Sequence, residues 1–164
     1  MTGRQPAVEP GVCILRYPLP GPTATTNLGA ALAPRLGRGD VLTLAGDLGA
    51  GKTTLARGLI GALGHAGPVP SPTFTLVQHY AIEPVPIWHF DLYRIGHRDE
   101  LVELGYDEAC AEGIVLVEWA DRLGPDLPAT RLNIALDYDR SGRARAAKLS
   151  GLATWTDRLQ GFWP

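Results

Sequence analysis

The chain has 164 residues, of which 45% are hydrophobic and 20% charged, and its net charge is -2. This length suits one domain (1–164) with a core that is stable without disulfides, and the small net charge argues against binding of nucleic acid or an anionic membrane through bulk charge. Cys13 and Cys110 lack metal-ligand spacing, and neither a signal peptide nor a long apolar span is visible, so we expect a cytoplasmic protein with reduced, buried thiols.

The first expected elements are a short strand and a helix. Residues 12–17 (VCILRY) form an apolar run that predicts an edge strand, which the following prolines end. Thr25 or Thr26 is expected to cap a helix that extends through residues 28–36. Pro34 lies within this helix, so we expect it to kink the helix or to end it early.

The next segment carries the most informative motif. Residues 46–53 read GDLGAGKT and match the phosphate-binding pattern G-x-x-x-x-G-K-[ST]. They lie between a buried strand expected at 41–45 and a helix expected at 53–63. The backbone N–H groups of such a loop, together with the helix N-terminus, can bind a phosphate chain. Lys52 would then reach the β- and γ-phosphates, and the Thr53 hydroxyl would bind Mg²⁺.

The use of lysine supports this interpretation. Lys52 and Lys148 are the only lysines of the chain, and its other basic residues are arginines. A phosphate loop needs a compact ammonium group, for which the planar guanidinium is a poor substitute. The rare lysine and the correct flanks favour a functional motif over a chance match in a glycine turn. The sequence therefore predicts a protein that binds a nucleoside triphosphate.

Two hydroxyl side chains follow on a loop that contains proline. Ser71 and Thr73 precede a strand expected at 74–80. Their hydroxyls could sense the γ-phosphate, as switch loops do in other proteins with a phosphate-binding loop. Alternatively, they could simply cap a turn.

Two acidic residues are candidates for the metal ion and the attacking water. A strand expected at 87–93 would present Asp91 on one face together with His89 and Tyr93, and such a polar face must meet solvent, a ligand or an ion. Glu118 follows a run of β-forming residues typical of a strand buried on both faces. Either acid could complete the metal shell while the other orients the water, and the sequence does not assign the two roles.

Each of these residues has a structural alternative. Asp91 could cap a helix or form a salt bridge beside Arg94, and Glu118 could be an exposed acid at the end of a strand. Trp119, next to the same strand, could simply pack against the core. Arg94 is the best internal candidate for an arginine finger.

The remaining elements complete the fold class. In chain order we expect a helix at 100–112, a strand at 114–117, a loop at 124–128, hairpin strands at 132–136 and 144–149 around a turn at 139–142, and a helix at 153–159. A basic cluster of Arg140, Arg143, Arg145 and Lys148 is either a solvated edge or an RNA contact. Together, the elements predict a three-layer α/β domain of the P-loop NTPase-like class with a central mixed sheet.

Four segments resemble the TsaE (YjeE) family of bacterial ATPases. They are TNLGAALA with GDLGAGKTTLARG, then SPTFTLV, HFDLYR and VEW, in the family's order. The resemblance spans about residues 26–149, so residues 1–20 and 151–164 are expected to be peripheral extensions. Ala120 stands where the family often has proline, which affects local stiffness and removes no functional group.

The resemblance implies an ATP- and Mg²⁺-dependent activity. TsaE proteins hydrolyse ATP, slowly when alone, and associate with the TsaB–TsaD pair, in which TsaD transfers the threonylcarbamoyl group to adenosine 37 of ANN-decoding tRNAs. They do not perform the transfer, and a contact with tRNA would be indirect or weak. By position, the ATP-binding residues are Thr26, Asn27, Gly46, Asp47, Leu48, Gly49, Ala50, Gly51, Lys52, Thr53 and Thr54. Lys52, Asp91 and Glu118 are implied in catalysis, Thr53, Asp91 and Glu118 around the metal, Ser71 and Thr73 in the switch-like loop, and Trp119 after the second acid.

Three other functions share parts of this pattern. A small-molecule kinase would need an arginine-rich lid, whereas the region after HFDLYR offers only Arg98 among acidic neighbours. A GTP-dependent switch would need an Asn-Lys-x-Asp element, but Lys148 is flanked by Ala147 and Leu149. A non-catalytic nucleotide-sensing scaffold would differ from an ATPase only in turnover.

Overall fold

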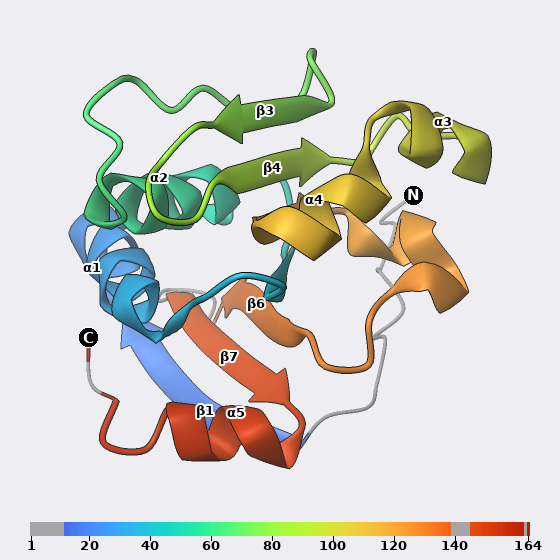
Figure 1. Ribbon diagram of the computed structural model, residues 1–164. Helices are drawn as coiled ribbons and strands as arrows, with labels where there is room; N and C mark the ends of the chain where they lie inside the picture. Colours follow the sequence, from blue (N-terminus) through green and yellow to red (C-terminus); the bar gives the residue numbers. More distant parts are fainter. Residues whose placement is uncertain (1–11, 139–144, 163) are drawn as a thin grey trace.

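A mixed sheet forms the middle layer of the computed structural model, which describes residues 12–138, 145–162 and 164 (Figure 1). The strands of this seven-stranded sheet are β1 (Val12–Leu19), β2 (Val41–Ala45), β3 (Val77–Tyr80), β4 (Ile87–Asp91), β5 (Ile114–Glu118), β6 (Leu132–Tyr138) and β7 (Arg145–Gly151). The helices are α1 (Pro22–Leu32), α2 (Lys52–Ala62), α3 (Arg98–Glu103), α4 (Tyr106–Glu112) and α5 (Ala153–Arg158), with 3-10 segments η1 (Ala33–Arg35) and η2 (Ala120–Asp126).

The strand order β1-β7-β6-β2-β5-β4-β3 places four parallel strands at the centre. β4, β5, β2 and β6 run parallel, and β3, β7 and β1 are antiparallel to their neighbours. Leu44 of β2 pairs with Glu118 of β5, which in turn pairs with Asp91 of β4. The carboxyl ends of three strands therefore meet at one edge of the sheet, where ligands bind in proteins of this architecture.

The two faces of the sheet bury different cores because side chains alternate along each strand. Leu42, Leu44 and Leu116 belong to the core under α1 and α2, whereas Val115 and Val117 belong to the core under α4 and η2. Parallel strands with apolar side chains on both faces are covered by helices on both faces. The expected three-layer α/β domain with a central mixed sheet is confirmed.

The helix α1 begins earlier than expected. Gly21 is its N-terminal flanking residue and Pro22 its first residue, a position that suits the fixed φ of proline. Thr25 is therefore buried within the helix instead of capping it, so that prediction was wrong. The helix ends at Leu32 and continues as a 3-10 turn that contains Pro34, which confirms the expected early end.

Four other elements differ from the expected ones. The strand expected at 74–80 is limited to β3, because the N–H of Leu76 donates to the carbonyl of Pro72 (2.7 Å) in a turn. The helix expected at 100–112 is two helices, broken at Gly105 with φ +74°. The loop expected at 124–128 is partly taken up by η2. The strand expected at 87–93 ends at Asp91.

Both ends of the described chain contribute to the core, whereas peripheral extensions were expected at 1–20 and 151–164. The first strand is an edge strand, as expected, yet Tyr17 and Leu19 are buried, and so are Trp155 and Leu159. The Tyr17 hydroxyl donates to the carbonyl of Phe162 (2.7 Å), so the two ends are tied together.

Other expectations fall partly outside the described residues. The hairpin strands β6 and β7 are present as expected, and their turn at 139–142, with Arg140, lies outside. The described part of the chain also leaves out residues 1–11, Arg143 and the side chain of Cys13. Cys110 is a free, half-buried thiol, and burial raises its pKa.

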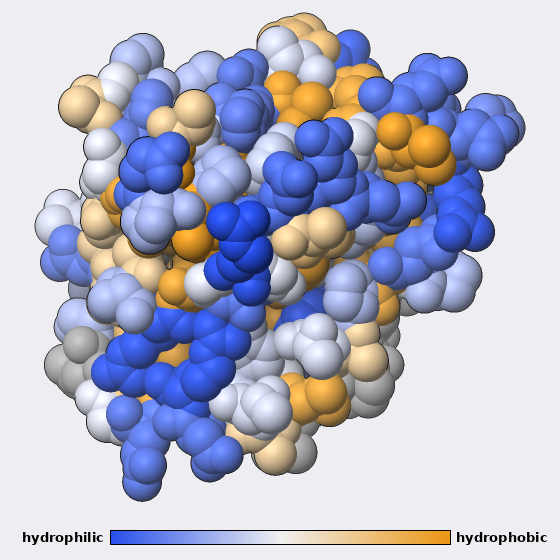
Figure 2. Space-filling view, viewed as in Figure 1, coloured by the Kyte–Doolittle hydropathy of each residue, from blue (hydrophilic) through white to orange (hydrophobic). Residues whose placement is uncertain are grey.

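The surface has the pattern of an ordinary folded protein. On the face shown in Figure 2, hydrophobic side chains gather in several small patches separated by hydrophilic ones, and such scattered apolar surface is normal. Within the described part of the chain, no helix has the length and apolar character that crossing a membrane would need.

Candidate nucleotide-binding site

The loop between β2 and α2 has a backbone that glycine makes possible. Gly46, Gly49 and Gly51 have φ values of +143°, +78° and +111°, in the left-handed half of the Ramachandran map. A Cβ atom on Gly46 would lie 2.5 Å from the carbonyl oxygen of Leu136, so this position also lacks space. Gly51 is the N-terminal flanking residue of α2, whose free N–H groups and positive dipole end can bind an anion.

Lys52 begins α2 and is almost fully buried (6% exposed). Its Nζ donates to the carbonyl oxygens of Gly46 (2.6 Å) and Asp47 (3.1 Å), so the ammonium group lies over the glycine loop. Burial lowers the pKa of Lys52, and the carboxylates of Glu118 and Asp91 partly offset this by favouring the charged form. The site therefore holds a desolvated cation beside two acids.

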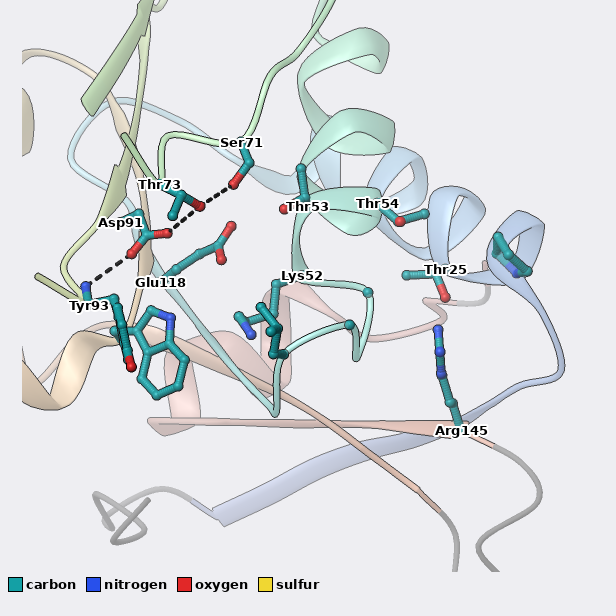
Figure 3. A pocket seen from close by; sticks show the side chains of 15 residues that line it. Thr25, Lys52, Thr53, Thr54, Ser71, Thr73, Asp91, Tyr93, Glu118 and Arg145 are labelled. Atoms are coloured by element: carbon teal, nitrogen blue, oxygen red, sulfur yellow. Dashed lines mark hydrogen bonds between the residues drawn. The ribbon is translucent and has the colours of Figure 1, made fainter. Parts of the chain in front are cut away.

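A cavity of about 510 Å³ opens at this edge of the sheet. Figure 3 shows side chains from the glycine loop, the strand ends and α1 converging on it. It is lined by Pro22, Thr25, Leu48, Gly49, Gly51, Lys52, Thr53, Thr54, Ser71, Thr73, Asp91, Tyr93, Glu118, Trp119 and Arg145. The predicted loop, hydroxyl and acidic residues are thus brought together by elements far apart in the sequence.

Asp91 connects β4 to the hydroxyl loop. Its Oδ2 accepts a hydrogen bond from the Thr73 hydroxyl (3.1 Å), its Oδ1 accepts one from the Tyr93 backbone N–H (3.0 Å), and the hydroxyls of Ser71 and Thr73 are 2.7 Å apart (Figure 3). Arg94 contacts the loop instead of Asp91, since its Nη2 donates to the Thr73 carbonyl and its guanidinium lies 5.4 Å from the Phe74 ring. Both carboxylate oxygens of Asp91 therefore accept hydrogen bonds, and Oδ2 holds the hydroxyl loop.

Glu118 is buried (3% exposed), so the alternative of an exposed strand-end acid is wrong. Its Oε1 accepts a hydrogen bond from Nε2 of His89 (2.9 Å), and His89 is completely buried. Among the residues that the structure describes, no further group donates to this carboxylate. Its side chain reaches into the cavity between Thr73 and Lys52 (Figure 3), which leaves one oxygen available to a ligand.

Two aromatic side chains form one wall. Trp119 has a left-handed backbone (φ +59°), its ring centroid lies 4.8 Å from that of Tyr93, and the Nζ of Lys52 is 5.3 Å from the Trp119 ring centroid. Trp119 lines the cavity as well as packing against the core, and its backbone conformation is unusual for a bulky residue. Such outliers are often found at functional sites.

Some predicted residues lie away from the cavity wall. Thr26 and Asn27 are exposed on α1, and the Thr26 hydroxyl donates to the Pro22 carbonyl (3.1 Å). Gly46, Asp47 and Ala50 belong to the loop without lining the cavity. Arg94 also lies outside the lining.

Four residues that line the cavity were not predicted as part of the site. Pro22 and Thr25 come from the N-terminal turn of α1, Tyr93 follows β4, and Arg145 begins β7. The guanidinium of Arg145 lies 5.6 Å from the Tyr138 ring, at the end of the cavity near Thr25 (Figure 3). An earlier start for α1 at Pro22 would have indicated the first two, whereas no local signal places Arg145.

A glycine loop between a parallel strand and a helix, at the carboxyl edge of a mixed sheet covered by helices on both faces, defines the P-loop NTPase-like class of α/β proteins. Sequence comparison then gives the family. Residues 19–147 match the family model described as "Threonylcarbamoyl adenosine biosynthesis protein TsaE", and the chain belongs to the TsaE family.

Individual relatives agree with this assignment. The chain is 41% identical over 127 residues to the tRNA threonylcarbamoyladenosine biosynthesis protein TsaE of a Nostoc species, covering 75% of this chain and 78% of that protein. It is 38% identical over 132 residues to TsaE of Streptomyces coelicolor, covering 77% and 89%. The crystal structure of Bacillus subtilis YdiB matches with a TM-score of 0.73 and 31% identity, covering 90% of this chain and 91% of that one.

Proposed function

We propose that this protein is a Mg²⁺-dependent ATPase that supports formation of threonylcarbamoyladenosine on tRNA in the cytoplasm and does not itself transfer the threonylcarbamoyl group. The observation that carries the proposal is the convergence of Lys52, Asp91 and Glu118 on one cavity behind a glycine loop. The names of its relatives support the pathway. We further propose that it acts with the TsaB–TsaD pair and contacts tRNA weakly or only through that pair.

The residues present fit a magnesium ion bound together with ATP. Magnesium is usually held by one or two carboxylates, a hydroxyl and the phosphates of the nucleotide. Glu118 has a carboxylate oxygen available in the cavity, and Thr53, the second residue of α2, lines the same cavity. When bound, the ion would neutralise charge on the β- and γ-phosphates.

The contacts support different roles for the two acids. Asp91 uses both oxygens to hold Thr73 and the backbone of Tyr93, so we assign it to anchoring the hydroxyl loop beside the γ-phosphate. Glu118 is held at one oxygen only, so we assign its other oxygen to the metal ion and its water. Lys52 would neutralise the charge that develops at the β–γ bridge.

A partner protein would explain how ATP hydrolysis at this site becomes fast. Arg94 is tied to the hydroxyl loop, and the arginine that lines the described cavity, Arg145, lies at the end away from Glu118 (Figure 3). An arginine supplied by another protein can accelerate phosphoryl transfer by orders of magnitude. We therefore expect slow hydrolysis by the isolated chain.

The test compares ATP binding and hydrolysis in the wild type and in Glu118→Gln. We expect the variant to bind Mg²⁺-free ATP within about threefold of wild type and to lose at least 100-fold in turnover, because the substitution removes charge at the transition state and little contact with the nucleotide. Full hydrolysis by Glu118→Gln would contradict the assignment. Transfer of phosphate to a small acceptor would favour a kinase, and binding without any turnover would favour a nucleotide-sensing scaffold.

A further inference from the structure

His89 is a polar side chain on a strand whose neighbouring residues are mostly apolar and buried. It lies on β4, is completely buried, and is on the same face as Ile87, which belongs to the core under α1 and α2. Its Nε2 is 2.9 Å from Oε1 of Glu118, whereas its Nδ1 is buried without a hydrogen-bond partner among the described residues. A buried, unpaired ring nitrogen is unfavourable, so an apolar residue would serve packing better at this position.

The pairing of the strands explains why His89 reaches Glu118. Asp91 is opposite Glu118 in the register, and His89 is two residues earlier on the same strand, opposite Leu116. Side chains two residues apart on a strand lie on the same face. His89 and Asp91 therefore flank Glu118 from β4, and the imidazole approaches the carboxylate from the interior while the cavity lies on its other side.

The hydrogen bond restricts the orientation of the carboxylate. A carboxylate can only accept, so Nε2 of His89 carries the hydrogen of this bond. A donor fixed at Oε1 limits rotation about the last side-chain bond of Glu118 and leaves Oε2 as the oxygen that faces the cavity. Groups that orient a ligand in this way affect metal affinity or activity by about 10- to 100-fold in other proteins.

We propose that His89 is a positioning residue that holds Glu118 so that its second carboxylate oxygen faces the magnesium ion and the nucleotide. The inference rests on the proposed function, because it assigns a role toward the same ion. Beyond the proposed function, the correct geometry of Glu118 depends on His89, an internal side chain that touches neither the nucleotide nor the metal.

Three variants separate positioning from packing. His89→Gln can place an amide N–H near the position of Nε2 and should keep the hydrogen bond. His89→Leu keeps the side-chain volume and removes the donor. If the leucine variant does not fold, His89→Asn takes its place, because the shorter amide reaches only the position of Nδ1. His79→Leu is the matched control, because His79 is exposed on β3 and stacks on Trp88 (4.4 Å).

The first measurement does not require turnover. Titration calorimetry gives the ATP dissociation constant without Mg²⁺ and the Mg²⁺ concentration that gives half of the added affinity. We expect His89→Leu to raise that Mg²⁺ concentration about 10-fold and to leave Mg²⁺-free ATP binding within about twofold of wild type. His89→Gln should recover most of the loss, and His79→Leu should match the wild type.

Steady-state hydrolysis, with the TsaB–TsaD pair present, gives the second measurement. We expect His89→Leu to lower kcat by about 10- to 100-fold, and to have no further effect in a Glu118→Gln background because both residues act through one carboxylate. If wild type shows Mg²⁺-dependent binding and turnover while His89→Leu equals His79→Leu in both, the positioning role is wrong and the proposed function stands. If wild type shows neither, the proposed function fails and this inference fails with it.

Discussion

The contact between α1 and α2 gives a sharp test of the packing. A Cβ atom on Gly58 of α2 would lie 2.1 Å from the backbone carbonyl oxygen of Thr26, far inside contact distance. Relieving it would require α1 to move by more than about 1 Å, because both groups belong to packed backbone. Overpacking of this kind costs about 1–3 kcal/mol, and the gain in helix propensity from glycine to alanine offsets at most about 1 kcal/mol. We expect Gly58→Ala to lower the free energy of unfolding by about 1–2 kcal/mol.

A matched control lies on the same helix. A Cβ atom on Gly61 would have nothing within 4 Å, so Gly61→Ala should raise the free energy of unfolding by up to about 1 kcal/mol. Urea denaturation of both variants measures these values. Because α1 carries Pro22 and Thr25 into the cavity, Gly58→Ala should also weaken ATP binding, which calorimetry measures. Equal or greater stability of Gly58→Ala relative to the wild type would refute the described approach of the two helices.

Three further predictions concern the site. Lys52→Ala should abolish tight ATP binding in calorimetry. Lys148→Ala, a change at a half-buried residue in the middle of β7, should leave the ATP affinity within about threefold of wild type. Equal losses of affinity in the two variants would count against ATP binding by the glycine loop. Burial lowers the pKa of Lys52 from its ordinary 10.5, so ATP affinity should begin to fall at a lower pH than an ordinary lysine would give. Between the lowered pKa and 10.5, the unfolded chain binds more protons than the folded chain. The contribution of Lys52 to the free energy of unfolding should therefore rise with pH in this range. An ATP affinity that stays constant up to pH 10.5 would exclude a lowered pKa of Lys52. Thr73→Val removes a hydrogen bond to Asp91 that is worth about 0.5–1.5 kcal/mol. The Leu76 amide, which donates to the Pro72 carbonyl in the same loop, should then exchange its hydrogen about 2- to 10-fold faster. Unchanged exchange would show that the hydrogen bond between Thr73 and Asp91 does not hold the loop.

The features that the sequence predicted well are local. The glycine loop, the flanking strand and α2 follow from consecutive residues whose backbone requirements are strong. The buried strand β5 follows from its uninterrupted β-forming residues, which are all buried. Local rules also placed the loop at the carboxyl end of β2 and Glu118 directly after the apolar run of β5, whereas Asp91 was expected within a strand that in the structure ends at this residue.

The features that it missed depend on contacts between distant segments. Gly105 breaks a helix whose residues have adequate helical propensity, because the chain turns there with a left-handed backbone. The buried ends β1 and α5 could not be recognised as core, since Tyr17 and Trp155 gain their burial only from the sheet and helices of the whole fold. In the same way, the bond between His89 and Glu118 joins residues that are 29 positions apart, and Arg145 reaches the cavity from the last strand.

We propose that this chain is an ATPase whose turnover depends on partner proteins. The most direct test measures ATP hydrolysis by the purified protein, alone and with the TsaB–TsaD pair, with Lys52→Ala as the blank. We expect low, Mg²⁺-dependent turnover by the isolated protein that rises at least 10-fold when the pair is added and is absent in Lys52→Ala. Turnover that does not respond to the pair, or that persists in Lys52→Ala, would contradict it.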